Sequence, residues 1–229
     1  MHHWSTLCAR TRRTSPSNPK WGSLTYAKGP LGAEAVHTYM CQPPALAVAA
    51  RGDLDEVRMV VTPTSPFKLD DELIPEQQRF QMVRLAVAEN PSIFASDVEF
   101  HLPRPNFTSK TLRHLRSENQ EIEFSVIIGE DNFDNLHRWE GYEEIISNHR
   151  ILVYPRRVSS PTIPPPKAPN KGGKTIVGED QVVVFTEAPM IAISSSYIRE
   201  AILTKQDIQY LLPDPVISYI GNNHLYEQM

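Results

Sequence analysis

The chain has 229 residues and a mass of 26.0 kDa, with 40% hydrophobic and 22% charged residues. This composition is that of a globular protein and excludes a fibrous or wholly disordered one. Cys8 and Cys41 are the two cysteines, and their early positions exclude a disulfide framework or a cysteine-based metal cluster in the rest of the chain. No apolar run reaches the ~20 residues of a membrane helix. We therefore expect a cytoplasmic protein that is not embedded in a membrane.

The charges are unevenly distributed along the sequence. Residues 1–51 contain six lysines and arginines and one acidic residue, whereas the remainder contains 17 basic and 26 acidic residues. An acidic body argues against a broad nucleic-acid surface, because neutralising a phosphate backbone requires clustered cations. Small anionic ligands that are held locally remain compatible with this charge.

Residues 1–44 differ in composition and sequence pattern from the rest of the chain. They show no sustained periodicity and are interrupted by Pro16, Pro19 and Pro30. We predict no regular element there. We expect a single domain that spans residues 45–229. Three interpretations are open: a disordered tail, an organelle-targeting peptide, and a misassigned start or reading frame. The scarcity of acidic residues favours targeting, but the prolines would break the amphipathic helix of a targeting peptide.

Strand and helix patterns alternate in the body of the chain. Apolar or β-branched runs predict strands at 56–62, 98–102, 124–129, 151–154, 181–185 and 190–193. Amphipathic spacing predicts helices at 77–89, 142–146, 195–203 and 215–220. A further helix is predicted after Thr108 or Ser109, either of which can cap it. Strands of continuous apolar character between helices predict an α/β fold, a doubly wound parallel sheet with helices on both faces. The proline-rich segment 159–174 is predicted to be an exposed loop.

In such a sheet, ligands bind at the carboxyl ends of the strands. Lys68 follows the first strand in a loop with two prolines, either to meet an anion or as an ordinary solvated lysine. Gly129 ends a strand and allows a ligand to approach the backbone. Asp131 can accept from sugar hydroxyls or cap a turn. Trp139 can stack on a flat ring or belong to the core.

The strongest signal lies between 193 and 199, where a predicted strand meets a predicted helix. Ser194, Ser195 and Ser196 bring hydroxyl groups to unpaired helix N–H groups, and Arg199 follows on the first turn. This combination suits phosphate oxygens. Capping alone would explain one serine, but not three serines with an arginine. The histidines show no metal-ligand spacing, so we expect no protein metal site.

These stretches, in this order, resemble bacterial nicotinate-nucleotide adenylyltransferases, nucleotidyltransferases with a Rossmann-like fold, over about residues 45–220. The family stretches S-P-x-x-P-F-K, R-x-G-x-S-Y-T-x-D-T-L, G-x-D followed by W, I-S-S-T-x-I-R and Y-L-x-P-x-x-V-x-x-Y-I are similar to 62–68, 104–112, 129–139, 193–199 and 210–220. Phe107 stands in place of the family's tyrosine, and Lys110 stands where an acidic residue is common.

The resemblance implies adenylyl transfer from ATP to nicotinate mononucleotide, a step of NAD biosynthesis that releases pyrophosphate. The residues it assigns to ATP are Gly129, Asp131, Ser194, Ser195, Ser196 and Arg199, and those it assigns to the acceptor are Phe107, Thr108 and Trp139. Lys68 and Arg199 are the implied catalytic residues, and Mg²⁺ is implied as a companion of ATP. Assembly into a homo-oligomer is compatible with the sequence.

One family motif is missing. The family opens with G-G-x-F-x-P-x-H-x-G-H, whose histidines bind the ATP phosphates, and no H-x-G-H occurs in this chain. We hypothesise that a shifted frame or misassigned start has replaced it, which DNA encoding H-x-G-H in another frame upstream of Ala45 would support. Two alternatives follow: a non-catalytic nucleotide-binding remnant, or a sibling adenylyltransferase with another acceptor. The contexts of Thr108 and Trp139 argue against the sibling.

Overall fold

The computed structural model describes residues 54–63, 74–154, 181–185 and 193–227, and the backbone of two strands nearer the amino terminus. The strands are β1 (Thr6–Arg12), β2 (Leu24–Lys28), β3 (Glu56–Val60), β4 (Ile93–Ser96), β5 (Ile122–Gly129), β6 (Ile151–Tyr154) and β7 (Val182–Val184). The helices are α2 (Glu76–Val87), α3 (Thr108–Glu118), α4 (Glu130–Asp134), α5 (Tyr142–Asn148), α6 (Ser195–Leu203) and α7 (Asp214–Asn222). Two 3₁₀ turns, η1 (Val98–His101) and η2 (Leu136–Arg138), complete them.

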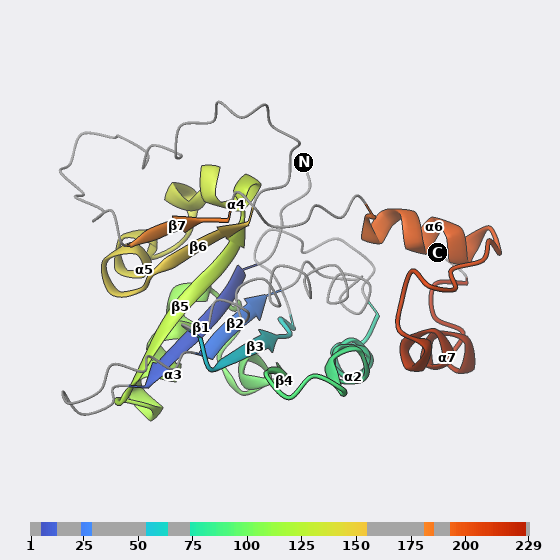
Figure 1. Ribbon diagram of the computed structural model, residues 1–229, viewed down its shortest axis with the longest axis horizontal. Helices are drawn as coiled ribbons and strands as arrows, with labels where there is room; N and C mark the ends of the chain where they lie inside the picture. Colours follow the sequence, from blue (N-terminus) through green and yellow to red (C-terminus); the bar gives the residue numbers. More distant parts are fainter. Residues whose placement is uncertain are drawn as a thin grey trace.

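The strands form one sheet (Figure 1). Strand β4 pairs in parallel with β3, and β5, β6 and β7 pair in parallel in that order. Between these groups, β1 and β2 each pair with both β3 and β5. Strand β2 runs parallel to its neighbours, whereas β1 runs antiparallel. The predicted parallel α/β sheet is confirmed, with one antiparallel strand added.

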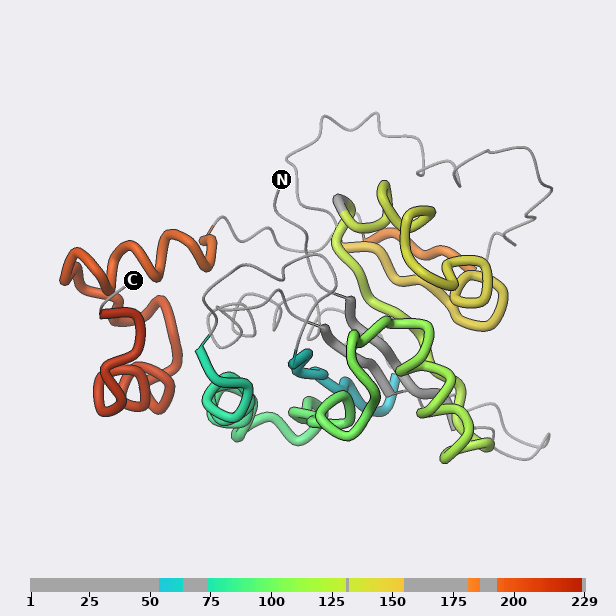
Figure 2. The backbone as a smooth tube through the Cα atoms, turned by 180° about the vertical axis from the view of Figure 1, so that it is seen from behind, coloured from blue at the N-terminus to red at the C-terminus, as the bar shows by residue number. Residues whose placement is uncertain are grey.

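Both faces of the sheet are buried. On β5, Ile127 belongs to one core, together with Val83 of α2, whereas its neighbours Val126 and Ile128 belong to a second core that contains Leu112 of α3. All five are at most 2% exposed. Helix α3 lies behind the strands in Figure 1 and in front of them in Figure 2. Helices on both faces explain why the strand sequences are largely apolar.

Helix α2 lies between the sheet and the helices α6 and α7 (Figures 1 and 2). Its Val83 faces the sheet core, while Met82 packs in a third core with Ile198 of α6 and Val216 of α7. This third core holds α6 beside the sheet, with the amino end of α6 nearer the strands (Figure 1). No helix in the described part of the chain is both long and apolar enough to cross a membrane.

Two predictions of secondary structure are wrong. The stretch predicted as a strand at 98–102 forms the turn η1, and the strand lies earlier, at β4. A short apolar run does not distinguish these alternatives, and pairing with β3 decides between them. Residues 1–44 were expected to hold no regular element, yet β1 and β2 lie there because the facing edges of β3 and β5 supply hydrogen-bonding partners. The loop 159–174 and residues 190–192 lie outside the described residues.

Candidate active site at the carboxyl ends of the strands

The start of α3 and the segment after η2 are in direct contact. Gly141 adopts a left-handed backbone with φ of +69°, and a Cβ atom there would lie 2.7 Å from Cβ of Ser109. A contact this close requires glycine. Ser109 is the second residue of α3, and Trp139 precedes Gly141 by two positions. The structure therefore brings the predicted acceptor residues Thr108 and Trp139 to neighbouring backbone segments.

A second contact joins the same two segments. The Nζ atom of Lys110 lies 3.7 Å from a carboxylate oxygen of Glu140 and 4.6 Å from the ring centroid of Phe107. Lys110 thus bridges the residue before α3 and the residue after Trp139. Trp139 itself is half-buried and packs against the second core with part of its indole. An indole in this setting can present its remaining face to a flat ring.

The predicted capping role of Thr108 and Ser109 is wrong. The residue at the N-cap of α3 is Phe107, which makes no side-chain cap hydrogen bond. Thr108 and Ser109 are the first two helical residues, and both are buried. The carbonyl of Phe107 accepts from the backbone N–H and the hydroxyl of Thr111 instead. With no side-chain cap, the first N–H groups of α3 are suited to an anion.

A further ion pair fixes the relative placement of α3 and α5. Nε of Arg113 donates to a carboxylate oxygen of Glu144 over 3.1 Å, and its Nη2 contacts the other oxygen. These hydrogen bonds hold the pKa of Glu144 below its ordinary value, and the carboxylate in turn raises the pKa of Arg113. The pair lies about one helical turn from the contact between Gly141 and Ser109.

Gly129 and the residues of α4 occupy the carboxyl end of β5. Gly129 is the last residue of β5 and the N-cap of α4, with an ordinary φ of −70°. Asp131 lies in α4, and its side chain is outside the described residues. Gly129 pairs with Tyr154 at the end of β6, so the two strands finish level with each other.

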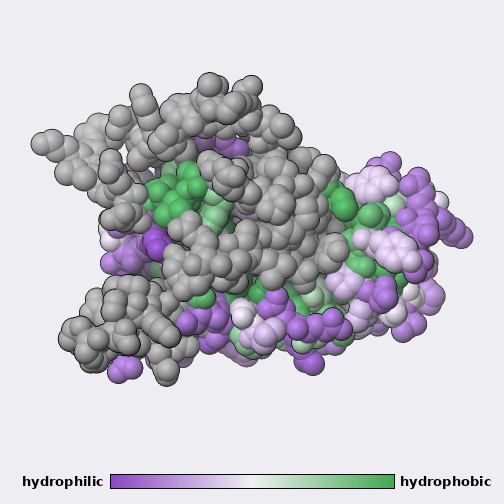
Figure 3. All heavy atoms as spheres, in the orientation of Figure 1, coloured by the Kyte–Doolittle hydropathy of each residue, from purple (hydrophilic) through white to green (hydrophobic). Residues whose placement is uncertain are grey.

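The serine cluster lies where it was predicted, at the start of α6. Ser194 is the N-cap, and its Oγ accepts from the backbone N–H of Tyr197 over 3.1 Å. Ser196 is exposed, and Nη2 of Arg199 lies 3.4 Å from its Oγ. One serine therefore caps the helix, and the binding of ATP by Ser194, Ser195, Ser196 and Arg199 stays a prediction. Figure 3 shows mainly hydrophilic residues, with apolar ones between them, on the side formed by α6 and α7.

Within the described part of the chain, four buried polar atoms on the segments that follow β3 and β5 and on α6 have no hydrogen-bond partner: Oγ1 of Thr62, Nδ2 of Asn132, Nδ1 of His137 and Nε of Arg199. Buried polar atoms are normally paired, so these four atoms are candidates for contact with a polar ligand. Among these, Arg199 alone was predicted. Asn132 directly follows the predicted Asp131, which is the one sequence signal that pointed to it.

Three further observations concern Lys68, metal binding and a hollow at the other end of the sheet. Lys68 lies outside the described residues, so its catalytic role stays a prediction. In the described ranges, no three histidine, cysteine, aspartate or glutamate side chains gather in a way that could hold a metal ion. A hollow of about 380 Å³ lies at the opposite end of β5, lined by residues that include Arg113, Arg116 and Ile122. That end carries the amino termini of the strands and is not the candidate site.

Comparison with known proteins decides the family. Residues 45–201 match the model of the cytidylyltransferase-like family. The chain is 41% identical over 181 residues to the probable nicotinate-nucleotide adenylyltransferase of Flavobacterium psychrophilum, covering 79% of this chain and 88% of that protein. A relative of the same name in Bacteroides fragilis is 38% identical over 193 residues, covering 83% and 84%. The chain belongs to the nicotinate-nucleotide adenylyltransferase family.

A solved structure agrees with this family at the level of the fold. The nicotinic acid mononucleotide adenylyltransferase of Plasmodium falciparum, determined in complex with NaAD, superimposes with a TM-score of 0.65 at 18% identity. The match covers 88% of this chain and 95% of that one. The Rossmann-like architecture of the adenylyltransferase family is therefore present here.

Proposed function

We propose that this chain, as a nicotinate-nucleotide adenylyltransferase, joins ATP to nicotinate mononucleotide at the carboxyl ends of β3 and β5. An oxygen of the nucleotide's 5′-phosphate attacks the α-phosphorus of ATP, the bond from that phosphorus to the bridging oxygen breaks, and pyrophosphate leaves. The products are nicotinate adenine dinucleotide and pyrophosphate. Such a transfer depends on alignment and charge neutralisation more than on covalent chemistry.

The acceptor end of the proposal rests on the contact between Gly141 and Ser109. It sets Trp139 beside the amino end of α3, so that one nucleotide can meet an indole face and helix N–H groups together. The pyridine ring would stack on Trp139, and its carboxylate would face Thr108, where the helix dipole favours an anion. A neutral carboxamide gains less from that dipole. Nicotinate is therefore the preferred acceptor over nicotinamide.

The ATP end of the proposal rests on α6. Ser195, Ser196 and Arg199 would bind phosphate oxygens together with the N–H groups of the first turn. The buried Nε of Arg199, which has no hydrogen-bond partner among the described residues, supports this role. Gly129, which ends β5, and Asp131 of α4 would contact the adenosine. Mg²⁺ would arrive bound to phosphate oxygens of ATP, where it would neutralise part of their negative charge.

The rate of the reaction depends on what replaces the family's histidines. No H-x-G-H occurs in the chain, so Lys68 and Arg199 are the proposed cationic groups near the reacting phosphates. Each transition-state donor that is lost lowers a rate by roughly 10²–10³. We therefore expect a turnover well below that of a relative that carries both histidines. This absence is also what favours the second candidate, a non-catalytic nucleotide-binding protein.

The test is pyrophosphate release from ATP and Mg²⁺ with four acceptor conditions: none, nicotinate mononucleotide, nicotinamide mononucleotide and phosphopantetheine. Release with the nicotinate compound, above the level with its amide, is the expected result. Release that is largest with another acceptor identifies a sibling transferase and overturns the proposal. ATP binding with no release under any condition assigns the chain to the non-catalytic alternative.

A further inference from the structure

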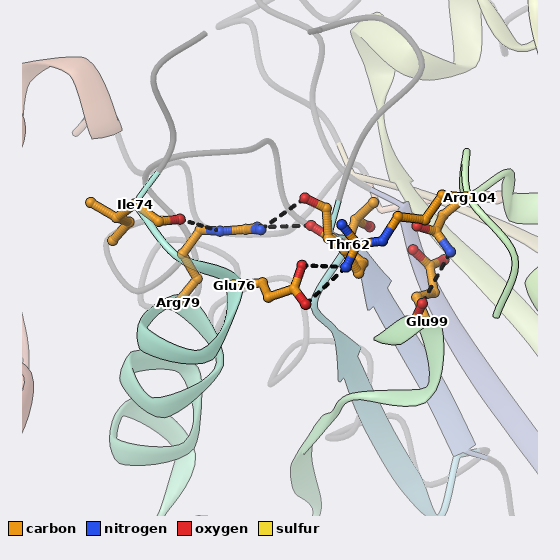
Figure 4. Close-up of polar contacts among 8 residues, drawn as sticks. Thr62, Ile74, Glu76, Arg79, Glu99 and Arg104 are labelled. Carbon is orange, nitrogen blue, oxygen red and sulfur yellow. Dashed lines mark hydrogen bonds and ion pairs between the residues drawn. The ribbon is translucent and has the colours of Figure 1, made fainter. Parts of the chain in front are cut away.

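The first turn of α2 contacts two chain segments that lead into the proposed site (Figure 4). Arg79 points from this turn toward the end of β3, and Glu76 points toward the segment before α3. The two residues are three positions apart and so lie on one side of the helix. Neither belongs to a stretch that carries the family resemblance.

Arg79 fixes the position of the turn. Its guanidinium is buried, with the residue 1% exposed. Nη1 donates to the carbonyl of Thr62 over 2.8 Å, Nη2 to the carbonyl of Pro63 over 3.0 Å, and Nε to the carbonyl of Ile74 over 3.1 Å. Charge-assisted hydrogen bonds of this kind are stronger than neutral ones. The end of β3 and the start of α2 are therefore held as one unit.

Glu76 connects the start of α2 to the segment that precedes α3, on the side of the proposed acceptor site. Nη2 of Arg104 lies 2.8 and 2.6 Å from the two carboxylate oxygens of Glu76. Two positions further on, Nδ2 of Asn106 donates to the carbonyl of Glu99 over 3.1 Å. The segment 104–106 is thus held by α2 on one side and by η1 on the other. It leads directly into Phe107 and Thr108, where α3 begins.

The contribution of this pair to stability is small. The side chain of Arg104 is 50% exposed and that of Glu76 is 28% exposed. Ion pairs this exposed stabilise a fold by about 0–1 kcal/mol. Removing the pair should leave the protein folded, while releasing the segment that sets the direction of the first turn of α3. A displacement of about 1 Å at a binding group is enough to weaken a precisely aligned interaction.

We propose that Glu76 and Arg104 are positioning residues for the acceptor nucleotide. Their ion pair orients residues 104–108, and thereby the amino end of α3, toward the pyridine carboxylate. This inference rests on the proposed function, because it concerns the same acceptor. One nitrogen of Arg104 makes both contacts, so a lysine ammonium at this position can serve the same carboxylate, unlike at the forked contacts of Arg79.

The experiment measures dissociation constants of nicotinate mononucleotide and of ATP separately, by calorimetry, for the wild-type chain and for Arg104→Met, Glu76→Gln and Arg104→Lys. We expect Arg104→Met and Glu76→Gln to weaken binding of the nicotinate compound about tenfold, which corresponds to about 1.4 kcal/mol. ATP affinity should stay unchanged. Arg104→Lys should restore most of the acceptor affinity, and the double variant should bind like either single one, because the two residues act as a pair.

The matched control is Arg58→Met. Arg58 makes an ion pair with Glu56 over 2.9 Å at the amino end of β3, away from the site. The affinity of the Arg58→Met variant for nicotinate mononucleotide should equal that of the wild type. Equal loss of ATP and acceptor affinity in Arg104→Met would mean a general structural role and overturns the inference, as does unchanged acceptor affinity. If the wild-type chain binds neither nucleotide, the proposed function is wrong. If the wild type binds both nucleotides and only the expected effect of the variants is missing, the inference alone is wrong.

Discussion

Nδ1 of His149 lies 2.7 Å from the carbonyl oxygen of Phe124, deep between the end of α5 and β5. A carbonyl oxygen only accepts, so Nδ1 carries the proton of the neutral ring. Burial lowers the pKa of His149 to about 4, and the backbone hydrogen bond and the charge of Glu144 oppose this only in part. The charge of Arg116 also lowers it. The folded protein thus keeps this imidazole neutral at pH values where the unfolded chain protonates it.

The first prediction concerns acid stability. Because the unfolded histidine binds a proton near pH 6.5 and the folded one only near pH 4, stability falls as the pH is lowered through this window, by about 2 kcal/mol at pH 5. His149→Gln keeps a donor but does not titrate. The free energy of unfolding of this variant, measured in urea at pH 7 and pH 5, should therefore lack the decrease of about 2 kcal/mol that His149 causes in the wild type. The control is His101→Gln at an exposed position, which should show the same decrease in unfolding free energy as the wild type. An equal dependence of unfolding free energy on pH in all three proteins would contradict the prediction.

The second prediction concerns Gly141. Gly141→Ala places a Cβ atom 2.7 Å from Cβ of Ser109 on a left-handed backbone. We expect a loss of about 1–3 kcal/mol in unfolding free energy, from the strained backbone and the clash. Because the segment of Trp139 must then move away from α3, affinity for nicotinate mononucleotide should fall more than affinity for ATP.

Gly221→Ala is its control. Gly221 lies in α7, and a Cβ atom there would meet nothing within 4 Å. Alanine in a helix should stabilise the protein by up to about 1 kcal/mol and leave both affinities unchanged. If the two alanine variants behave alike in denaturation and calorimetry, the close approach of Gly141 to Ser109 is not a determinant of the acceptor site.

The third prediction separates the serines of α6. Ser194 accepts from the N–H of Tyr197, so Ser194→Ala should cost about 1 kcal/mol of stability through the lost cap. Ser196 is exposed and caps nothing, so Ser196→Ala should leave the melting temperature unchanged and weaken ATP binding instead. Differential scanning calorimetry and ATP titration report the two quantities separately. Unchanged ATP affinity in Ser196→Ala would contradict the proposed phosphate contact.

The fourth prediction concerns the strands nearest the amino terminus. A chain lacking residues 1–44 loses β1 and β2, which leaves the facing edges of β3 and β5 unpaired. Each buried backbone group without a partner costs about 1–3 kcal/mol. We expect aggregation in size-exclusion chromatography or a melting temperature lower by more than about 10 °C. Deleting residues 1–5, which precede β1, should have little effect. A shortened chain with the wild-type melting temperature shows that these strands are dispensable.

Much of the fold was predictable because its signals are local. Apolar runs identified β3, β5, β6 and β7, and the periodicity and capping residues of α6 placed that helix at the residues where the structure has it. The alternation between two cores along β5 follows from its consecutive apolar residues 126–128, which point alternately to the two faces of the sheet. The position of Gly129 at the carboxyl end of β5 was predictable in the same way, because chain direction alone decides which end of a parallel strand a following residue occupies.

The remainder depended on contacts between residues far apart in the sequence. Glycine at 141 looks like any other until Ser109 is seen beside it, and Arg79 looks like a surface residue of a helix until three carbonyl oxygens surround it. β1, β2 and β4 were missed because their stability comes from partner strands and not from their own composition. The sequence by itself determined the class of sheet and the residue types at its edge. Only the tertiary structure decided which backbone groups meet there, since that is set by packing across the fold.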